Sequence, residues 1–145
     1  MVRAMKDGLE RFVSAQEKSY DTALQEIRTG RKRSHWMWYI FPQIAGLGHS
    51  QTARYYAIKD MEEARAYMKH EILGKNLIEI SQALLQTPSS DPGEVMGWPD
   101  DMKLKSSMTL FLLAAPECNV FQKVLDKRQR AKFCNNHEYG NRWGN

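Results

Sequence analysis

The sequence predicts an all-α protein, a compact single-domain bundle of about six to eight short helices over residues 1–145. Apolar residues recur at spacings of three and four along most of the chain, which is the period of a helix face. The composition, with 42% hydrophobic and 26% charged residues, is typical of a globular protein. A chain of this length buries roughly two-thirds of its unfolded surface in one core. We find neither an internal repeat nor a linker that would divide it.

The first helical segment has an apolar face that repeats after eleven residues. Leu9, Phe12, Val13 and Gln16 form the first half, and Tyr20, Ala23, Leu24 and Ile27 form the second. Eleven residues are close to three helical turns, so one continuous helix and two short helices, the second capped by Asp21, fit the pattern equally well. In either case Gly30 ends the segment.

An aromatic run follows, for which we predict a helix of about two turns over residues 35–41. Ser34 is its expected N-cap, and Pro42 ends it because proline cannot continue the hydrogen-bond ladder. The run is also β-prone and apolar on both faces, so a buried strand is the alternative. The helical surroundings favour the helix.

A glycine-containing turn separates this run from the next helix. Gly46 and Gly48 interrupt the chain, and Ser50 is the expected N-cap of a short helix that reaches Ile58. A tight turn that needs positive φ explains such glycines.

Two further helices have clearer signals. Asp60 followed by Glu63 is a variant of the capping box, and it begins a helix whose apolar face is Met61, Ala64 and Met68. The apolar face of the next helix is formed by Leu73, Leu77, Ile80 and Leu84. That helix ends at Thr87-Pro88.

The last third begins with an irregular connection over residues 87–101, rich in proline. Asp100 or Asp101 is the expected cap of the following helix, which Pro116 stops. Its apolar face is Leu104, Met108, Phe111 and Ala115, and a final helix carries Val120, Phe121, Val124 and Leu125. We expect a loosely ordered tail over residues 131–145.

We expect a cytosolic protein, because the sequence shows no targeting or membrane-spanning segment and has only two cysteines. The N-terminus has no apolar run long enough for a signal peptide, no segment is apolar enough to span a membrane, and Cys118 and Cys134 are expected to stay reduced.

The net charge of +4 is compatible with phosphate or nucleic-acid binding, but an ordinary surface produces it as well. The cations cluster in two runs: Arg28, Arg31, Lys32 and Arg33, and then Lys127, Arg128, Arg130 and Lys132.

The first candidate site is the segment from Lys32 to Trp38, in which basic residues adjoin a histidine and two tryptophans. Cationic donors beside flat rings are suited to a phosphate attached to a planar group. On a helix, His35 and Trp38 share one side with Tyr39, while Trp36 lies on the other. Burial of the aromatic rings in the core explains the same residues without a ligand.

Two further segments carry candidate binding residues. In residues 41–50, Gln43, His49 and Ser50 adjoin a backbone that could approach an anion. In residues 100–109 the candidates are Asp100, Lys103, Ser106, Ser107 and Thr109. The structural alternative for this second segment is that Asp101 caps the helix, the lysines are solvated and the hydroxyls bond to the preceding turn.

Catalysis and metal binding have weaker signals. The Ser-x-x-Lys order of a serine acylation site is absent, because lysine precedes serine here. Cys134 and His137 have a suitable spacing for two metal ligands, but a structural zinc site needs four, and we assign no metal. No segment specifies a cofactor, a reaction or an oligomeric state.

Five stretches of the sequence form a recognisable pattern: Phe12 to Gln16, Gly30 to Ser50, Glu63-Ala64 with Tyr67, Leu73-Gly74, and Gly97 to Phe111 with Asp100, Lys103, Leu104, Ser106, Ser107, Met108, Thr109 and Leu110. In these stretches the chain resembles a bacterial family of unknown function, DUF1810. The resemblance implies a compact, mainly helical cytosolic protein and supplies no catalytic residues. The resemblance covers Leu9 to about Lys127, and the ending from Arg130 to Asn145 departs from the family's pattern.

Members of this family are sometimes labelled calpastatin, and we give that label no weight. Inhibitors of calpain are disordered chains built from repeats, whereas this sequence has a periodic core and no repeat.

The candidate sites lead to three hypotheses about function. The first is a pocket for a small anionic or planar, nucleotide-like ligand, which requires the segments around Lys32 and Lys103 to meet. The second is a protein-interaction or scaffold domain, and the third is a nucleic-acid-binding module.

Overall fold

The computed structural model describes residues 2–87 and 91–131, with side chains from Gly8 onward. Its helices are α1 (Val2–Arg28), α2 (Met37–Ile40), α3 (Gln51–Tyr55), α4 (Met61–Lys69), α5 (Leu73–Gln86), α6 (Pro92–Met96) and α7 (Asp100–Ala114), followed by a last helix over residues 120–131. In these ranges the sole pairing of extended backbone is an isolated bridge between Ile44 and Ile58. The all-α prediction is confirmed.

The first helix is continuous, which decides between the two alternatives for residues 9–27. It ends in a Schellman motif: the amide of Arg31 donates to the carbonyl of Glu26 over 3.0 Å, and the amide of Gly30 donates to Ile27 over 3.0 Å. Gly30 has a φ of 93°, which is the left-handed conformation that this motif requires. The chain therefore turns sharply into the basic segment that follows.

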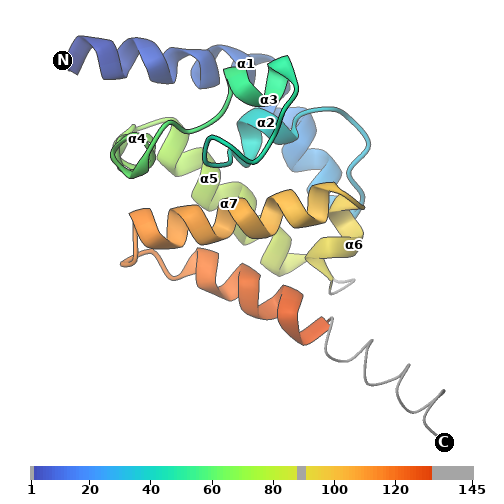
Figure 1. Ribbon diagram of the computed structural model, residues 1–145. Helices are drawn as coiled ribbons and strands as arrows, with labels where there is room; N and C mark the ends of the chain where they lie inside the picture. Colours follow the sequence, from blue (N-terminus) through green and yellow to red (C-terminus); the bar gives the residue numbers. More distant parts are fainter. Residues whose placement is uncertain (1, 88–90, 132–145) are drawn as a thin grey trace, which may run out of the picture.

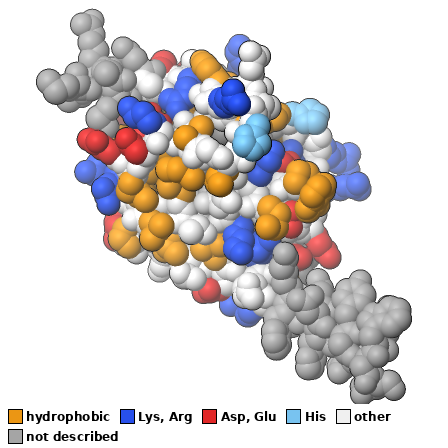
Figure 2. Space-filling model, in the orientation of Figure 1, with side chains coloured by type: hydrophobic (Ala, Val, Ile, Leu, Met, Phe, Trp, Pro, Cys, Tyr) orange, Lys and Arg blue, Asp and Glu red, His pale blue; other side chains and the backbone are white. Residues whose placement is uncertain are grey.

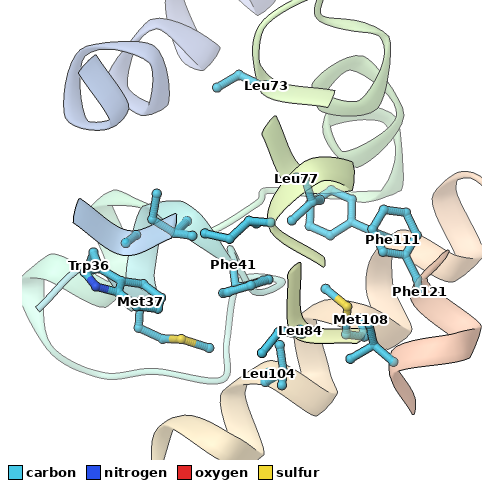
Figure 3. Packing of buried hydrophobic residues seen from close by; sticks show 14 of the residues in the cluster. Trp36, Met37, Phe41, Leu73, Leu77, Leu84, Leu104, Met108, Phe111 and Phe121 are labelled. Atoms are coloured by element: carbon cyan, nitrogen blue, oxygen red, sulfur yellow. The ribbon is translucent and has the colours of Figure 1, made fainter. Parts of the chain in front are cut away.

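The helices form one hydrophobic core (Figure 1, Figure 3). Helix α1 packs on α2, α4 and α5, while α7 packs on α4 and α6. A chain of aromatic contacts crosses the core, because the Tyr67 ring lies 5.2 Å from Phe12 on α1 and 5.1 Å from Phe111 on α7. Phe111 in turn lies 6.1 Å from Phe121 in the last helix. Each fully buried ring of this kind contributes roughly 1.5–3 kcal/mol to folding.

A buried polar residue joins four segments of this bundle. The Gln16 side chain is 4% exposed, and its amide donates to the carbonyl of Tyr39 over 2.8 Å and to the Tyr67 hydroxyl over 3.0 Å. Its carbonyl accepts from the Asn76 amide over 3.0 Å. Gln16, which the helical pattern places on an apolar face, thus ties the end of α2 to the core.

The aromatic segment is helical, but its helix is shorter than predicted. α2 is a single turn, and Trp36 rather than Ser34 is its N-cap, without a side-chain hydrogen bond. The prediction that Ser34 caps the helix is wrong because the Ser34 hydroxyl donates to Glu26 instead, over 2.5 Å. The Ser34 side chain therefore bonds to Glu26 on α1 and does not cap α2.

The two predicted caps of the middle helices are correct. The Ser50 hydroxyl accepts from the amide of Ala53 at 3.0 Å, and the Asp60 carboxylate accepts from the amide of Glu63 at 2.9 Å. However, α3 ends at Tyr55, before the predicted Ile58. Ile58 instead pairs with the chain at Ile44, which ends the helix early.

Residues 87–101 are not an irregular connection throughout. They contain α6, in which the Asp91 side chain accepts from the amide of Gly93 and Pro92 occupies the first turn. The predicted cap at Asp100 or Asp101 is also wrong, because Pro99 is the N-cap of α7 and both aspartates lie in its first turn. Their carboxylates form ion pairs instead.

Candidate functional site

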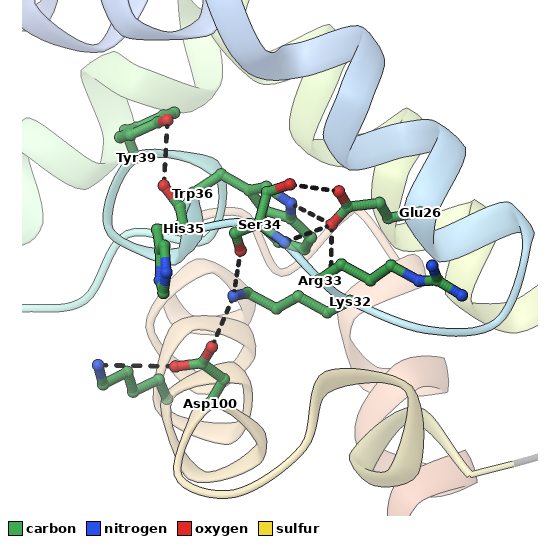
Figure 4. Close-up of polar contacts among 9 residues, drawn as sticks. Glu26, Lys32, Arg33, Ser34, His35, Trp36, Tyr39 and Asp100 are labelled. Atoms are coloured by element: carbon green, nitrogen blue, oxygen red, sulfur yellow. Dashed lines mark hydrogen bonds and ion pairs between the residues drawn. The ribbon is translucent and has the colours of Figure 1, made fainter.

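The loop that leads into the aromatic segment is organised by one carboxylate, that of Glu26 on α1 (Figure 4). Its Oε1 accepts from the amides of Arg33 and Ser34, over 2.8 and 2.9 Å, and from the Trp36 indole over 2.9 Å. Burial raises the pKa of Glu26, but these hydrogen bonds outweigh it and lower the pKa from 4.5 to about 2. The carboxylate is therefore ionised and fixes the conformation of residues 33–36.

Lys32 and Asp100 join this loop to the start of α7. The Lys32 ammonium lies 2.9 Å from the Asp100 carboxylate, with side-chain exposures of 8% and 20%, and it donates to the carbonyl of Ser34 over 2.6 Å. It also lies 4.8 Å from the ring centroid of Trp36. The two segments that the pocket hypothesis requires to meet do meet. The Lys32 ammonium is already paired with Asp100 and Ser34 in this contact.

The segment between α2 and α4 is held as a closed loop. The amide of Ala45 donates to the carbonyl of Ile58 and the amide of Ile58 donates to the carbonyl of Gln43, each over 2.8 Å. Gly46 adopts a φ of 102° in the turn, whereas Gly48 allows close approach, because a Cβ there would lie 2.6 Å from that of Ala53. The loop thereby presents residues 43–53 to α7.

A cavity of about 450 Å³ opens between this loop and the first turns of α7. The predicted site residues that line it are Trp38, Gln43, His49, Ser50, Lys103 and Ser106. The other lining residues include Leu47, Pro99 and Met102. We call this cavity the pocket. Residues far apart in the sequence thus combine an indole face, an amide, an imidazole, hydroxyls and an ammonium group.

The Lys103 ammonium gives the pocket its positive charge. It lies 5.8 Å from the ring centroid of Trp38 and 3.6 Å from the Asp100 carboxylate. Asp100 is shared with Lys32, so the three groups carry two positive charges and one negative charge. The Lys103 side chain is 33% exposed and remains accessible to an anion.

The remaining predicted site residues lie elsewhere. Trp36 is 1% exposed and belongs to the core, whereas His35 is exposed and does not line the pocket. Ser107 is buried, and the exposed Thr109 donates to the carbonyl of Lys105 over 2.8 Å, as a helical hydroxyl does. Trp36 and Thr109 therefore fit their structural interpretations, whereas the buried Ser107 hydroxyl has no hydrogen-bond partner in the described part of the chain.

Two residues of the second basic run, Lys127 and Arg128, are engaged inside the protein, whereas Arg130 is exposed. The Lys127 ammonium donates to the carbonyls of Leu84, Leu85 and Thr87 at the end of α5, over 2.9 to 3.2 Å. The Arg128 guanidinium is buried and lies 3.7 Å from the Asp101 carboxylate. Lys132 lies outside the described residues. Lys127 and Arg128, two of the cations that suggested nucleic-acid binding, thus have structural roles.

Sequence reasoning missed the aromatic surface that continues from Trp38 over α3. Tyr55 is 60% exposed, and its ring lies 4.8 Å from that of Tyr56, which lies 5.2 Å from Tyr39. Arg11 on α1 holds the backbone beneath them, by donating to the carbonyls of Tyr55 and Ala57 over 2.7 and 2.8 Å. The available signal was the pair of adjacent aromatic residues, Tyr55 and Tyr56, at the end of a short helix.

Neither a cluster of metal ligands nor a membrane-crossing helix is found in the described residues. No group of three His, Cys, Asp or Glu side chains there is placed to hold a metal ion, and Cys134 and His137 lie outside that part of the chain. Within residues 2–87 and 91–131, no helix combines the length and the apolar character that crossing a membrane requires.

The fold and the pocket define an all-α bundle with a basic, aromatic cavity. The chain belongs to the family described as protein of unknown function (DUF1810), whose model matches residues 6–138. It is similar to the crystal structure of the conserved hypothetical protein Rv1873 from Mycobacterium tuberculosis, with 46% sequence identity, a TM-score of 0.80, and coverage of 82% of this chain and 85% of that one. No curated protein matches the sequence. The family resemblance found in the sequence is confirmed.

Proposed function

We propose that this protein binds a small anionic ligand with a planar group, such as a nucleotide, in the pocket between the loop of residues 43–53 and α7. The observation that carries the proposal is the position of Lys103 beside the half-buried ring of Trp38 at the rim of a 450 Å³ cavity. A ring face supports stacking, and an adjacent ammonium attracts a phosphate.

The polar lining supports a ligand of this kind. Gln43 provides an amide that both donates and accepts, and Ser106 adds a hydroxyl from the same helix as Lys103. The Ser50 oxygen accepts from the amide of Ala53, which leaves the hydroxyl proton as a donor. A few polar groups on an otherwise apolar wall are typical of small-molecule sites.

The experiment is a calorimetric titration with adenosine 5′-monophosphate, adenosine and inorganic phosphate. We expect the nucleotide to bind more tightly than either fragment, because it uses both the ring and the cation. Lys103→Gln should weaken nucleotide binding about tenfold and leave adenosine binding unchanged, since one charge-assisted hydrogen bond is lost. Trp38→Leu should weaken the binding of both adenosine compounds.

The matched control is Lys105→Gln, which removes the same charge from an exposed position on the same helix, outside the pocket. It should bind the nucleotide as the unchanged protein does. Circular dichroism checks that each variant is folded. Equal nucleotide affinity in the Lys103 variant and the unchanged protein, or no binding of the nucleotide at millimolar concentration, would contradict the proposal.

A further inference from the structure

The pocket is one end of a longer surface, which we call the aromatic groove. A second hollow of about 810 Å³ shares Trp38 with the pocket and is lined by Tyr39, Tyr55 and Tyr56. A third, of about 630 Å³, shares these three tyrosines and extends over α1. The three hollows are therefore joined through shared walls. Figure 2 shows that apolar and basic side chains lie interspersed on the face of Figure 1.

The ring faces of the groove are held in place from below. The Tyr39 hydroxyl donates to the Ser19 hydroxyl over 2.9 Å, and the Tyr56 ring lies 5.9 Å from that of the buried Phe12. The Tyr55 carbonyl accepts from Arg11 on α1. A fixed platform loses little conformational freedom when a ligand stacks on it.

A cation lies in each of the three hollows: Lys18 in the third, Arg54 in the second and Lys103 in the pocket. Lys18 and Arg54 are exposed. Arg11 is not one of the cations available to a ligand, because its guanidinium is bonded to backbone carbonyls and to Glu63. Glu10 is the one carboxylate that lines these hollows in the described part of the chain. The groove therefore combines ring faces with a positive charge in each of three adjacent hollows.

We propose that the aromatic groove binds single-stranded nucleic acid, whose bases stack on the rings while its phosphates pair with Lys18, Arg54 and Lys103. This inference rests on the proposed function, because it takes the pocket as one position of a longer site. Stacking on protein rings requires accessible base faces, which a single strand offers and a duplex hides. Ring faces tolerate any base, so the binding is expected to depend little on sequence.

The test measures fluorescence anisotropy of labelled octamers, dT8 and rU8, at low salt. Octamers suit a site of roughly 4–16 nucleotides. The double variant Lys18→Gln/Arg54→Gln should raise the Kd about tenfold and reduce the slope of log Kd against log salt by about 1.4, because two phosphate contacts are lost. Tyr55→Ala should weaken binding about tenfold through the loss of one stacked base. Because Tyr55 is exposed, this variant is expected to fold.

The matched control is Arg65→Gln/Lys75→Gln, which removes the same charge from exposed positions on α4 and α5, outside the groove. An equal loss of affinity in both double variants would overturn the proposal, because binding would then follow net charge alone. Binding of an eight-base-pair duplex as tightly as the single strands would also overturn it.

The same variants separate this inference from the proposed function. Binding of adenosine 5′-monophosphate in the pocket should be retained in Tyr55→Ala. If the nucleotide binds but neither octamer does, the groove proposal fails and the pocket proposal stands. If the octamers bind through Tyr55 but the nucleotide does not bind, the groove stands alone. If neither binds, both proposals fail.

Discussion

At the scale of single residues, the structure separates polar groups that hold the fold from groups that remain accessible. Lys32 and Glu26 belong to the first kind, since each contacts several partners within the same loop. Lys103 belongs to the second, because it shares its one carboxylate with Lys32 and adjoins a cavity. The sequence places Lys32 and Lys103 in equally distinctive segments, so it could not distinguish their roles.

Replacement of Glu26 tests its structural role. Glu26→Gln should lower the free energy of unfolding by about 1–3 kcal/mol, because a neutral amide oxygen would replace the charged oxygen that accepts three N–H groups in a half-buried site. Urea denaturation at pH 7 measures the change. The control is Glu17→Gln, at an exposed position of the same helix, which should have little effect. Equal stability of the two variants would rule out the role given to Glu26.

The pH dependence of stability provides a second test of Glu26. Its pKa in the folded state, about 2, lies below the ordinary value of 4.5. The stabilisation is therefore complete above about pH 4.5 and is lost as the pH falls toward 2. The stability difference between the unchanged protein and Glu26→Gln should be smaller at pH 3 than at pH 7. A difference that stays constant over this range would contradict the lowered pKa.

At the scale of elements, apolar periodicity predicted the long helices, and polar contacts between segments decided the short ones. The faces around Phe12, Leu77 and Phe111 are buried as expected. α2 is shorter than predicted because Glu26 takes the Ser34 hydroxyl. α6 was missed, although Asp91 before Pro92 is the usual beginning of a helix.

The end of α5 depends on a side chain from another helix. Lys127→Met should lower the free energy of unfolding by about 1–3 kcal/mol, because three carbonyls at the end of α5 lose a charged donor. Lys123→Met, at an exposed position of the same last helix, is the control. Urea denaturation of both variants measures the difference. A loss no larger in the Lys127 variant than in the control would disprove this role.

The contact between α4 and α5 requires a glycine. A Cβ at Gly74 would lie 2.1 Å from the carbonyl oxygen of Met68, which is backbone and cannot rotate away. Gly74→Ala should therefore lower the melting temperature, with a loss of about 1–3 kcal/mol from overpacking. Lys75→Ala changes the exposed neighbour and should leave the melting temperature nearly unchanged. An unaltered melting temperature in Gly74→Ala would show that the connection can shift.

At the scale of the whole molecule, folding brings residues 38–53 and residues 99–106, which are distant in the sequence, to one cavity. The sequence indicated both segments, because polar and aromatic residues are concentrated there. It could not indicate Tyr39, Tyr55 and Tyr56 as one surface, since their proximity depends on Arg11 and on the pairing of Ile44 with Ile58. The aromatic run itself divides between two roles, with Trp36 in the core and Trp38 at the pocket.

This division allows a direct measurement of ligand binding in the pocket. In a nuclear magnetic resonance titration with adenosine 5′-monophosphate, the indole N–H signal of Trp38 should shift progressively to saturation. The signal of Trp36 should stay in place, because its indole donates to Glu26 inside the fold. Lys103→Gln should reduce the affinity obtained from the Trp38 shift. A Trp38 signal that does not move at millimolar nucleotide would contradict the pocket as a nucleotide site.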